Sequence, residues 1–319
     1  MCLKGKKILI TGGLGFIGRT LTESLISSGC GAELYAIDIK DMPDDAVAMK
    51  ENVKFDRLDI RNATAVRAYF SEHRFDGVVH LAAVSRVVVA EQNKRDCIET
   101  NYIGTKNLAE AMAETGSGWM IFGSSREVYG ESAGVPVKED SPLLPLNIYG
   151  FYKLEGERTV RSLIKRNCVL RFCNVYGNTY DIPGRVVPAF VKAAMRGGEV
   201  CLEGGNQIID FTSVGDTVSS IVQCMKKMGK GEISADTIHI SPGVGNRITD
   251  IIDILRDMGF KLNVKKEQQR DFDVQRFVGD PSHREEVLGR SKFRTLRQGI
   301  EELVEMYKRE QGTPRNQTT

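Results

Sequence analysis

Two residues suited to proton transfer lie four positions apart near the middle of the chain, in the segment "NIYGFYKLEGE". On a helix, Tyr149 and Lys153 would share one face, so the ammonium group could sit beside the phenol. A phenol ordinarily titrates near about 10, and nearby positive charge favours its ionised form. The pair therefore predicts that Tyr149 removes a proton from a substrate hydroxyl group. A surface helix that carries these two residues by chance is the alternative.

A serine at the end of an apolar run could assist this proton transfer. Ser125 closes the run "WMIFGSS", and in a doubly wound sheet the carboxyl ends of the strands form the ligand crevice. A serine there can hydrogen-bond the hydroxyl group that Tyr149 deprotonates. An ordinary turn serine is the alternative.

A glycine-rich turn follows the first apolar run, in "ITGGLGFIGRT". Gly12, Gly15 and Gly18 would permit a tight turn and let a pyrophosphate approach the backbone at a helix N-terminus. The pattern alone is weak in a chain with 32 glycines. Its context is stronger, because Asp38 ends the second apolar run about 20 residues later, where an acid binds the adenosine ribose. An acid there repels a 2′-phosphate, so the pattern favours NAD over NADP.

The elements that must position these residues form an alternating pattern. Short β-rich runs lie at 7–11, 33–38, 53–59, 77–82, 119–125 and 168–175, and helical patterns between them include 20–29 and 101–116. This alternation predicts a Rossmann-like, doubly wound parallel α/β sheet, residues 1–175. After about residue 176 prolines and glycines interrupt shorter elements, which predicts a smaller, irregular lobe over 176–319, with segments of the two parts interleaved.

The composition excludes several other classes of protein. Lys+Arg 44 against Asp+Glu 42 leaves no field that would recruit nucleic acid or an acidic membrane, and no apolar run is long enough to span a bilayer. The first apolar run is too short for a signal peptide. Seven cysteines and four histidines are scattered without ligand spacing, so we expect no catalytic metal and a reducing, cytoplasmic location.

The order of the motifs resembles a known family. Gly-x-x-Gly-x-x-Gly, two aspartates, "HLAA", Ser-Ser-x-x-Val-Tyr-Gly, Tyr-x-x-x-Lys and "RFCNVYG" are similar to the extended short-chain dehydrogenases/reductases that act on nucleotide sugars, the NAD-dependent epimerase/dehydratase family, and among them to UDP-glucose 4-epimerases. The likeness runs from residue 7 to about residue 305. It implies a homodimer that pairs through the Tyr-Lys helix, and it makes the second lobe a nucleotide-sugar site.

The resemblance also implies roles for individual residues. Tyr149 is the base, Lys153 binds the nicotinamide ribose and lowers the pKa of the tyrosine, and Ser125 assists. The expected cofactor-binding residues, besides Tyr149 and Lys153, are Gly12, Gly15, Phe16, Ile17, Gly18, Asp38, Asp59, Ile60, Leu81, Ala82, Ala83 and Asn101. The expected substrate-binding residues are Ser85, Arg86, Ser125, Asn174, Arg185, Val187 and Arg270.

The reaction implied is transient oxidation at C4 of the sugar followed by re-reduction with inversion. Glu127 keeps an alternative open, a 4,6-dehydratase or decarboxylase, because dehydratases of the family have a glutamate there. Arg126 disfavours elimination, since many dehydratases have an aspartic acid at that position and a guanidinium is a poor proton donor. Ile209 replaces an arginine that usually binds the diphosphate, which would leave that task to Arg185 or Arg270. A non-catalytic NAD-binding scaffold is a more distant alternative.

Overall fold

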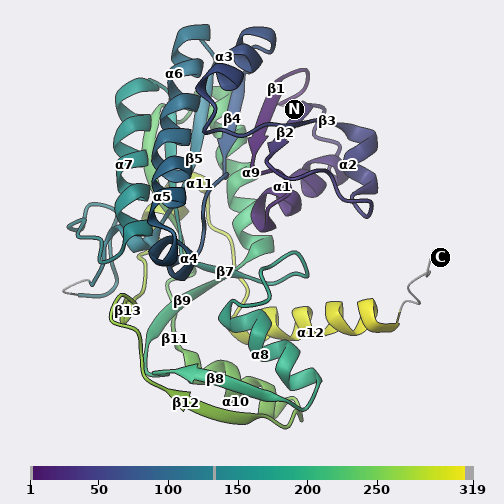
Figure 1. Ribbon diagram of the computed structural model, residues 1–319, viewed down its shortest axis with the longest axis vertical. Helices are drawn as coiled ribbons and strands as arrows, with labels where there is room; N and C mark the ends of the chain where they lie inside the picture. The colour runs from purple at the N-terminus through teal and green to yellow at the C-terminus, as the bar shows by residue number, and fades with distance from the viewer. Residues whose placement is uncertain (1–2, 132–133, 313–319) are drawn as a thin grey trace.

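The computed structural model describes residues 3–131 and 134–312. A central sheet of seven parallel strands runs through the larger part of the molecule in the order β10-β6-β5-β4-β1-β2-β3 (Figure 1). The predicted doubly wound sheet is therefore confirmed. Its strands are β1 (Lys7–Thr11), β2 (Glu33–Asp38), β3 (Val53–Arg57), β4 (Gly77–His80), β5 (Trp119–Ser125), β6 (Asn167–Phe172) and β10 (Ala235–Ile240).

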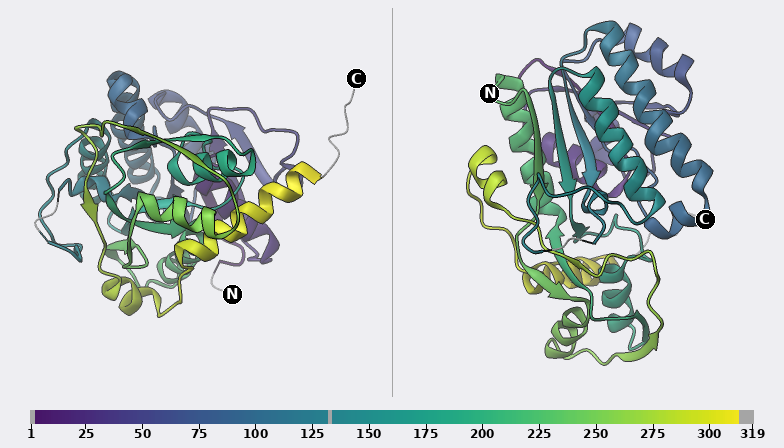
Figure 2. Two further views of the ribbon diagram at one scale, coloured as in Figure 1. Left: turned by 90° about the horizontal axis from the view of Figure 1, so that it is seen from below. Right: turned by 90° about the vertical axis from the view of Figure 1, so that its left-hand side faces the viewer.

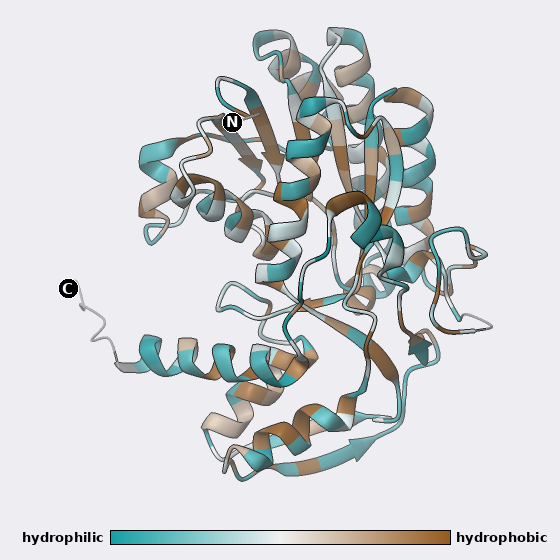
Figure 3. Cartoon of the chain, turned by 180° about the vertical axis from the view of Figure 1, so that it is seen from behind, coloured by the Kyte–Doolittle hydropathy of each residue, from teal (hydrophilic) through white to brown (hydrophobic). Residues whose placement is uncertain are grey.

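Helices cover both faces of this sheet, as the right-hand view of Figure 2 shows. Within β1, Ile8 and Ile10 point to one face of the sheet and pack into a core with the helices on that face, the first layer. Leu9 lies between them and packs into a separate core with the helices on the opposite face, the second layer. Burial on both faces explains why these strands are continuous apolar runs, which Figure 3 shows as brown strands between helices with hydrophilic outer faces. The first layer contains α1 (Phe16–Ser27) and α9 (Val214–Lys230), and the second contains α3 (Ala63–Glu72), α6 (Thr105–Thr115) and α7 (Ile148–Leu163).

A smaller lobe lies beyond the carboxyl ends of the strands, at the bottom of Figure 1. Its core is a separate apolar cluster in which Phe211, Ile252 and Ile300 are buried. In the described residues this lobe contains two small sheets and three helices. They are β7 (Asn174–Tyr176), β9 (Ile208–Ser213), β11 (Gly245–Arg247), β13 (Arg276–Phe277), β8 (Glu199–Glu203), β12 (Asn263–Glu267), α8 (Val186–Met195), α10 (Ile248–Asp257) and α12 (Leu296–Gly312).

Short helical elements complete the connections. They are α2 (Val47–Asn52), α4 (Val87–Gln92), α5 (Lys94–Cys97), the π-helical turn η1 (Ile98–Gly104), the 3-10 turn η2 (Arg126–Val128) and α11 (Ser282–Leu288). The helix predicted at 20–29 begins earlier, at Phe16, and Gly29 follows its end with φ 57°. The helical pattern at 101–116 is real but is divided between η1 and α6.

The bounds of three predicted strands are wrong. The run at 168–175 is not one strand, because the chain leaves the main sheet at Cys173 and its last residues pair as β7 with β9 of the smaller lobe. The runs at 53–59 and 77–82 end early, so Asp59 and Leu81 follow their strands instead of closing them. A seventh strand, β10, was not predicted at all.

The chain returns to the main sheet after its first visit to the smaller lobe. Strand β10 pairs in parallel with β6 at the sheet edge, and α9 packs beside α1. Segments after residue 176 thus contribute to the sheet, which accords with interleaved segments. The division into 1–175 and 176–319 stays a prediction.

Candidate active site

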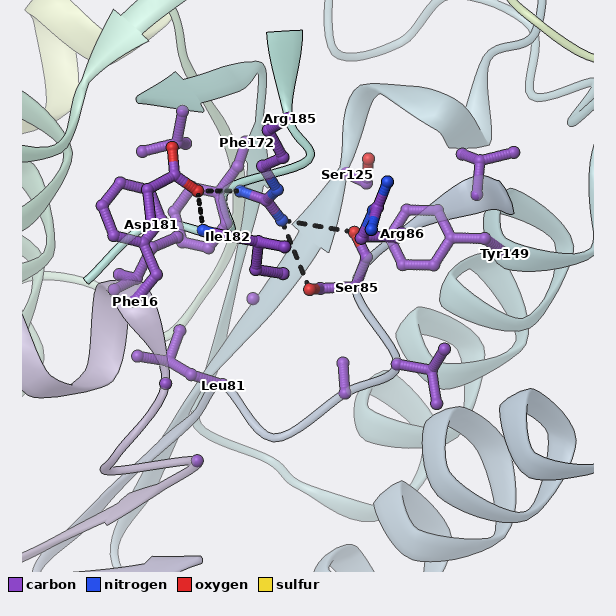
Figure 4. A pocket seen from close by; sticks show the side chains of 18 of the residues that line it. Phe16, Leu81, Ser85, Arg86, Ser125, Tyr149, Phe172, Asp181, Ile182 and Arg185 are labelled. Carbon is purple, nitrogen blue, oxygen red and sulfur yellow. Dashed lines mark hydrogen bonds and ion pairs between the residues drawn. The ribbon is translucent and has the colours of Figure 1, made fainter. Parts of the chain in front are cut away.

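A cavity of about 640 Å³ lies at the carboxyl ends of the central strands, between the sheet and the smaller lobe. Its lining extends from the glycine turn after β1 to residues of the smaller lobe such as Ile209 and Arg270. Among the expected site residues, it includes Gly12, Gly15, Phe16, Ile17, Gly18, Asp38, Asp59, Ile60, Leu81, Ala82, Ala83, Ser85, Arg86, Ser125, Glu127, Tyr149, Lys153, Asn174, Arg185, Val187 and Arg270. Figure 4 shows part of this wall, with Tyr149 and Ser125 facing the cavity from α7 and β5.

The proposed base is held at the first turn of α7. Asn147 caps this helix, since its Oδ1 accepts a hydrogen bond of 2.8 Å from the backbone N–H of Gly150. Gly150 lets the helix approach η2, because a Cβ there would meet the carbonyl oxygen of Glu127 at 2.4 Å. The helix start is therefore fixed against the segment that carries Ser125 and Glu127.

Burial dominates the acid strength of the phenol. It raises the pKa of Tyr149 to about 12, and a hydrogen bond with Ser125 and the positive charge of Arg185 oppose this rise. The protein alone therefore does not show the lowered pKa that was expected of the base. Tyr149 needs further positive charge beside it to ionise near neutral pH.

Lys153 is a buried ammonium donor one turn further along α7. Its Nζ donates to the carbonyl oxygen of Gly123 at 2.7 Å and lies 4.9 Å from the centre of the Phe122 ring. Burial lowers the pKa of Lys153 to about 8. No ion pair with a carboxylate joins it within the described part of the chain, so its remaining donor capacity is available to a ligand.

The glycine turn after β1 depends on close packing of the backbone. Gly12 adopts φ 67°, and a Cβ on it would meet the backbone nitrogen of Ala82 at 2.8 Å. A Cβ on Gly18 would lie 2.1 Å from the carbonyl oxygen of Gly12. These contacts explain why the turn between β1 and α1 requires glycine at both positions.

Asp38 closes β2 beside this turn. Its Oδ2 accepts from the backbone N–H of Leu14 at 3.1 Å, and its Oδ1 accepts from that of Lys40 at 3.2 Å. The carboxylate is thus fixed at the cavity wall, where the sequence predicted an acid for the adenosine ribose.

Two of the expected cofactor contacts have other partners. Asp59 lines the cavity but forms an ion pair of 2.7 Å with Arg61. Asn101 does not line the cavity: its amide forms two hydrogen bonds with the backbone of Val84, of 2.8 and 3.0 Å. Asn101 supports the loop after β4, and its expected direct contact with the cofactor is not supported by this position.

Arg185 reaches across the cavity from the start of α8, as Figure 4 shows. Its Nη1 lies 3.5 Å from Oδ1 of Asp181. Its Nη2 donates to the backbone oxygen of Ser85 at 3.4 Å and to the Oγ of Ser85 at 3.3 Å. Arg86 donates back to the backbone oxygen of Gly184 at 3.3 Å. Arginine contacts therefore join the loop after β4 to the segment before α8.

Asp181 was not expected in the site. Its side chain is fully buried, and burial raises its pKa to about 6, although the charge of Arg185 opposes this shift. Its Oδ2 has no hydrogen-bond partner within the described residues. Sequence alone could not identify it, because nothing in "NTYDIPGR" marks this acid as buried.

The part of the cavity wall in the smaller lobe lacks the arginine that the family pattern would place in β9. Ile209 is buried there in β9. Arg270 lines the same part of the wall but forms ion pairs with Glu203 at 2.9 Å and Asp273 at 2.8 Å. A bound diphosphate would have to compete with these carboxylates for the guanidinium.

Comparisons with known proteins identify the family. The model of the NAD dependent epimerase/dehydratase family matches residues 8–236. The chain belongs to this family. A bifunctional UDP-glucose 4-epimerase and UDP-xylose 4-epimerase of Pisum sativum is 27% identical, over 95% of this chain and 95% of the relative.

Solved structures of family members have the same fold. A UDP-glucuronic acid 4-epimerase of Bacillus cereus, in complex with UDP-glucuronic acid and NAD, is 26% identical with a TM-score of 0.86, over 95% of this chain and 99% of that one. A dTDP-glucose 4,6-dehydratase of Streptomyces venezuelae with NAD bound is 25% identical with a TM-score of 0.86, over 96% and 98%. The family contains both reactions that the sequence left open.

The site of this family member fits NAD. The buried ammonium of Lys153 has the carbonyl of Gly123 as its acceptor and can still donate to ribose hydroxyls, and the carboxylate of Asp38 stands beside the glycine turn. These features lie along one continuous cavity wall. In the described part of the chain, no cluster of acidic, histidine or cysteine side chains could hold a metal ion, and no helix could cross a membrane.

Proposed function

We propose that this chain is an NAD-dependent nucleotide-sugar 4-epimerase. When bound, NAD supplies reversible oxidation at C4 of the sugar. Tyr149 takes the proton of the C4 hydroxyl group and later returns it, while Ser125 hydrogen-bonds the same oxygen. Lys153 binds the nicotinamide ribose, and its charge together with that of the oxidised cofactor favours the phenolate.

The observation that carries this proposal is the placement of three side chains at one cavity wall. Ser125, Tyr149 and Lys153 are all buried there, and Ser125 is among the neighbours that lower the pKa of Tyr149. A site that only bound a dinucleotide would need neither the serine nor the phenol. The arrangement suits chemistry on a hydroxyl group.

A 4,6-dehydratase or a decarboxylase is the second candidate, and Glu127 is the residue that favours it. Glu127 lines the same cavity two residues after Ser125. Both of its oxygens are engaged, because Oε1 lies 2.9 Å from Nη2 of Arg126 and Oε2 accepts from Nδ2 of Asn147 at 2.8 Å. A carboxylate held in this way is poorly placed to move a proton, which favours epimerisation.

The substrate would be a nucleoside diphosphate sugar. We assign its sugar to the wall formed by Ser125, Asn174 and Arg185, and its diphosphate to the end of the cavity where Arg270 lies. NAD is preferred over NADP because Asp38 would repel a 2′-phosphate. The protein would act in a reducing compartment such as the cytoplasm, which the scattered cysteines of the sequence support.

A homodimer is also part of this proposal. Helix α7 packs on η1, and both carry exposed apolar side chains: Phe151 is 45% exposed, Leu163 38% and Ile103 37%. These side chains would be covered if the helices of two copies packed together.

The test is turnover of UDP-glucose and UDP-glucuronic acid by the NAD-loaded protein in deuterated water, with products identified by NMR. A C4-inverted sugar without solvent deuterium at C5 is expected. A 4-keto-6-deoxy product with deuterium at C5 would identify a dehydratase instead, and loss of carbon dioxide from the uronic acid a decarboxylase.

A further inference from the structure

Oxidation at C4 exposes a hexose to an unwanted reaction. The 4-keto sugar has an acidic proton at C5, next to the ketone, and a hydroxyl group at C6, one carbon further on. A base that removed the C5 proton would allow the C6 hydroxyl to leave. An epimerase that passes through this ketone must therefore keep free bases away from C5.

One carboxylate of this chain lies where such a base could act. Glu127 lines the cavity beside Ser125 and is 7% exposed. One partner is Arg126, which is 6% exposed and presents Nη2 to Oε1 of Glu127 at 2.9 Å. Asn147, 5% exposed, donates Nδ2 to the other oxygen at 2.8 Å.

The Arg126 side chain is itself held on several sides. Its Nε donates to Oδ1 of Asn174 at 2.9 Å, and its guanidinium carbon lies 5.8 Å from the centre of the Phe277 ring. Asn174 also lines the cavity. The guanidinium of Arg126 thus contacts both Glu127 in η2 and Asn174 in β7, which belong to different lobes. Its Nη1 is buried without a hydrogen-bond partner in the described residues.

We infer that Arg126 determines the outcome of the reaction by holding Glu127, together with Asn147, so that the carboxylate stays turned toward these two partners and cannot turn to take the C5 proton. This inference rests on the proposed epimerase function and adds a specificity-determining residue to it. Arg126 acts through Glu127 and is a positioning residue, not a catalytic one. A guanidinium is also a poor proton donor, so it gives no help to a departing C6 hydroxyl.

The reaction that Arg126 suppresses balances without any added reagent. Glu127 would take the C5 proton, the C6–O bond would break, and the departing C6 oxygen would leave as water after taking a proton from solvent or from the carboxylic acid that Arg126→Asp introduces. The two electrons removed from C4 would return to C6 instead of C4, and a solvent proton would add at C5. The product is a 4-keto-6-deoxy sugar.

The experiment compares wild type, Arg126→Asp, Arg126→Ser and the double variant Arg126→Asp with Glu127→Gln, each loaded with NAD and given UDP-glucose in deuterated water. We expect Arg126→Asp to raise the fraction of product labelled at C5 at least about tenfold over the background level measured with wild type, since a positioned general base contributes about 10²-fold or more. Some of that product should have lost water. The double variant should lose this gain, because it lacks the carboxylate that takes the C5 proton.

Arg126→Ser frees Glu127 without adding a second carboxylate, and it should increase C5 labelling even if water loss is slow. Melting temperature and NAD content establish which variants are folded. If either folded single variant forms only the C4-inverted sugar without C5 label, the inference is wrong. If wild type itself forms the 4-keto-6-deoxy sugar, the proposed epimerase function is wrong. This result differs from the one that contradicts the inference, in which wild type is an epimerase and the Arg126 variants form no product labelled at C5.

Discussion

At the scale of single residues, the proposed chemistry depends on one ionisable oxygen. Tyr149→Phe removes the phenol oxygen but keeps the ring in its apolar surroundings of Ala90 and Cys97. We expect turnover of the nucleotide sugar to fall at least about 10²-fold, because general base catalysis is lost. NAD content should remain near that of wild type. Product formation measured by NMR and cofactor absorbance check both parts, and turnover like that of wild type would exclude Tyr149 as the base.

A buried acid provides a second test at this scale. Burial raises the pKa of Asp181 from 3.8 to about 6, so the folded protein binds a proton more readily than the unfolded chain. Its ionised form therefore costs stability, and the cost grows as pH rises from about 4 to about 6 and stays constant above that. Asp181→Asn mimics the neutral form and should raise the free energy of unfolding at pH 8 by up to about 3 kcal/mol.

The same substitution should impair substrate binding. Arg185 would lose the carboxylate that lies 3.5 Å from it, so we expect KM for UDP-glucose to rise more than kcat falls.

Chemical denaturation of wild type and Asp181→Asn at several pH values measures the predicted change in the free energy of unfolding. A stability gain that did not shrink between pH 6 and pH 5 would contradict the titration of Asp181.

Residues of the catalytic pattern could be predicted because their spacing lies within single elements or single turns. Ser125, Tyr149, Lys153 and the glycines are of this kind. Asp181 was not predicted, and the hydrogen bonds of Asn101 were not foreseen, because their partners are fixed only by tertiary structure: Asn101 bonds Val84, and Asp181 lies beside Arg185 in a buried pocket wall.

At the scale of elements, α1 can pack against the turn that follows β1 only because Gly18, in the first turn of the helix, has no side chain. Gly18→Ala would place a Cβ 2.1 Å from the carbonyl oxygen of Gly12, so the backbone of the turn must shift. We expect a loss of about 1–3 kcal/mol in the free energy of unfolding, together with loss of NAD binding. Thermal unfolding and NAD titration measure the two effects.

Gly198→Ala is the matched control for that substitution. A Cβ there would meet its nearest atom, the carbonyl oxygen of Ala193, at the ordinary distance of 3.5 Å. This variant should bind NAD as wild type does. Equal effects of the two alanines would show that the close approach at Gly18 does not control the cofactor site.

The strands of the main sheet could be predicted from their apolar runs, whereas the change of sheet after β6 could not. The run "CVLRFCNV" contains no proline or glycine at which a reader would divide it. Strand β10 was missed for a related reason: it includes Asp236, Thr237 and His239, and only the structure shows that His239 is buried next to Tyr129. Polar residues interrupt the apolar pattern by which a buried strand is predicted, and their hydrogen-bond partners in distant segments cannot be identified from the sequence.

At the scale of the whole molecule, two lobes meet around one cavity and the chain crosses between them more than once. After its visit to the smaller lobe it supplies α9 and β10 to the main sheet, so the order of segments along the sequence does not follow the lobes. The alternating pattern of the first half therefore predicted the sheet well, whereas the approximate boundary at residue 175 stays a prediction.

The exposed apolar side chains of α7 and η1 lead to a prediction about assembly. Phe151, Leu163 and Ile103 lie on helices that pack together, and a stable interface would bury about 1,200–2,000 Å² around them. We expect wild type to sediment at twice the chain mass of 35.4 kDa. Phe151→Asp should shift the protein to the monomer, because it would bury an unpaired charge in an apolar interface.

Leu144→Asp is the control, since Leu144 is an exposed apolar residue, 67% exposed, outside these helices. It introduces the same charge and should leave the dimer intact. Sedimentation velocity at micromolar concentration distinguishes the two species. A monomeric wild type, or a dimer that survives Phe151→Asp, would contradict pairing through α7, and Tyr149 would then have to be positioned by contacts within one chain alone.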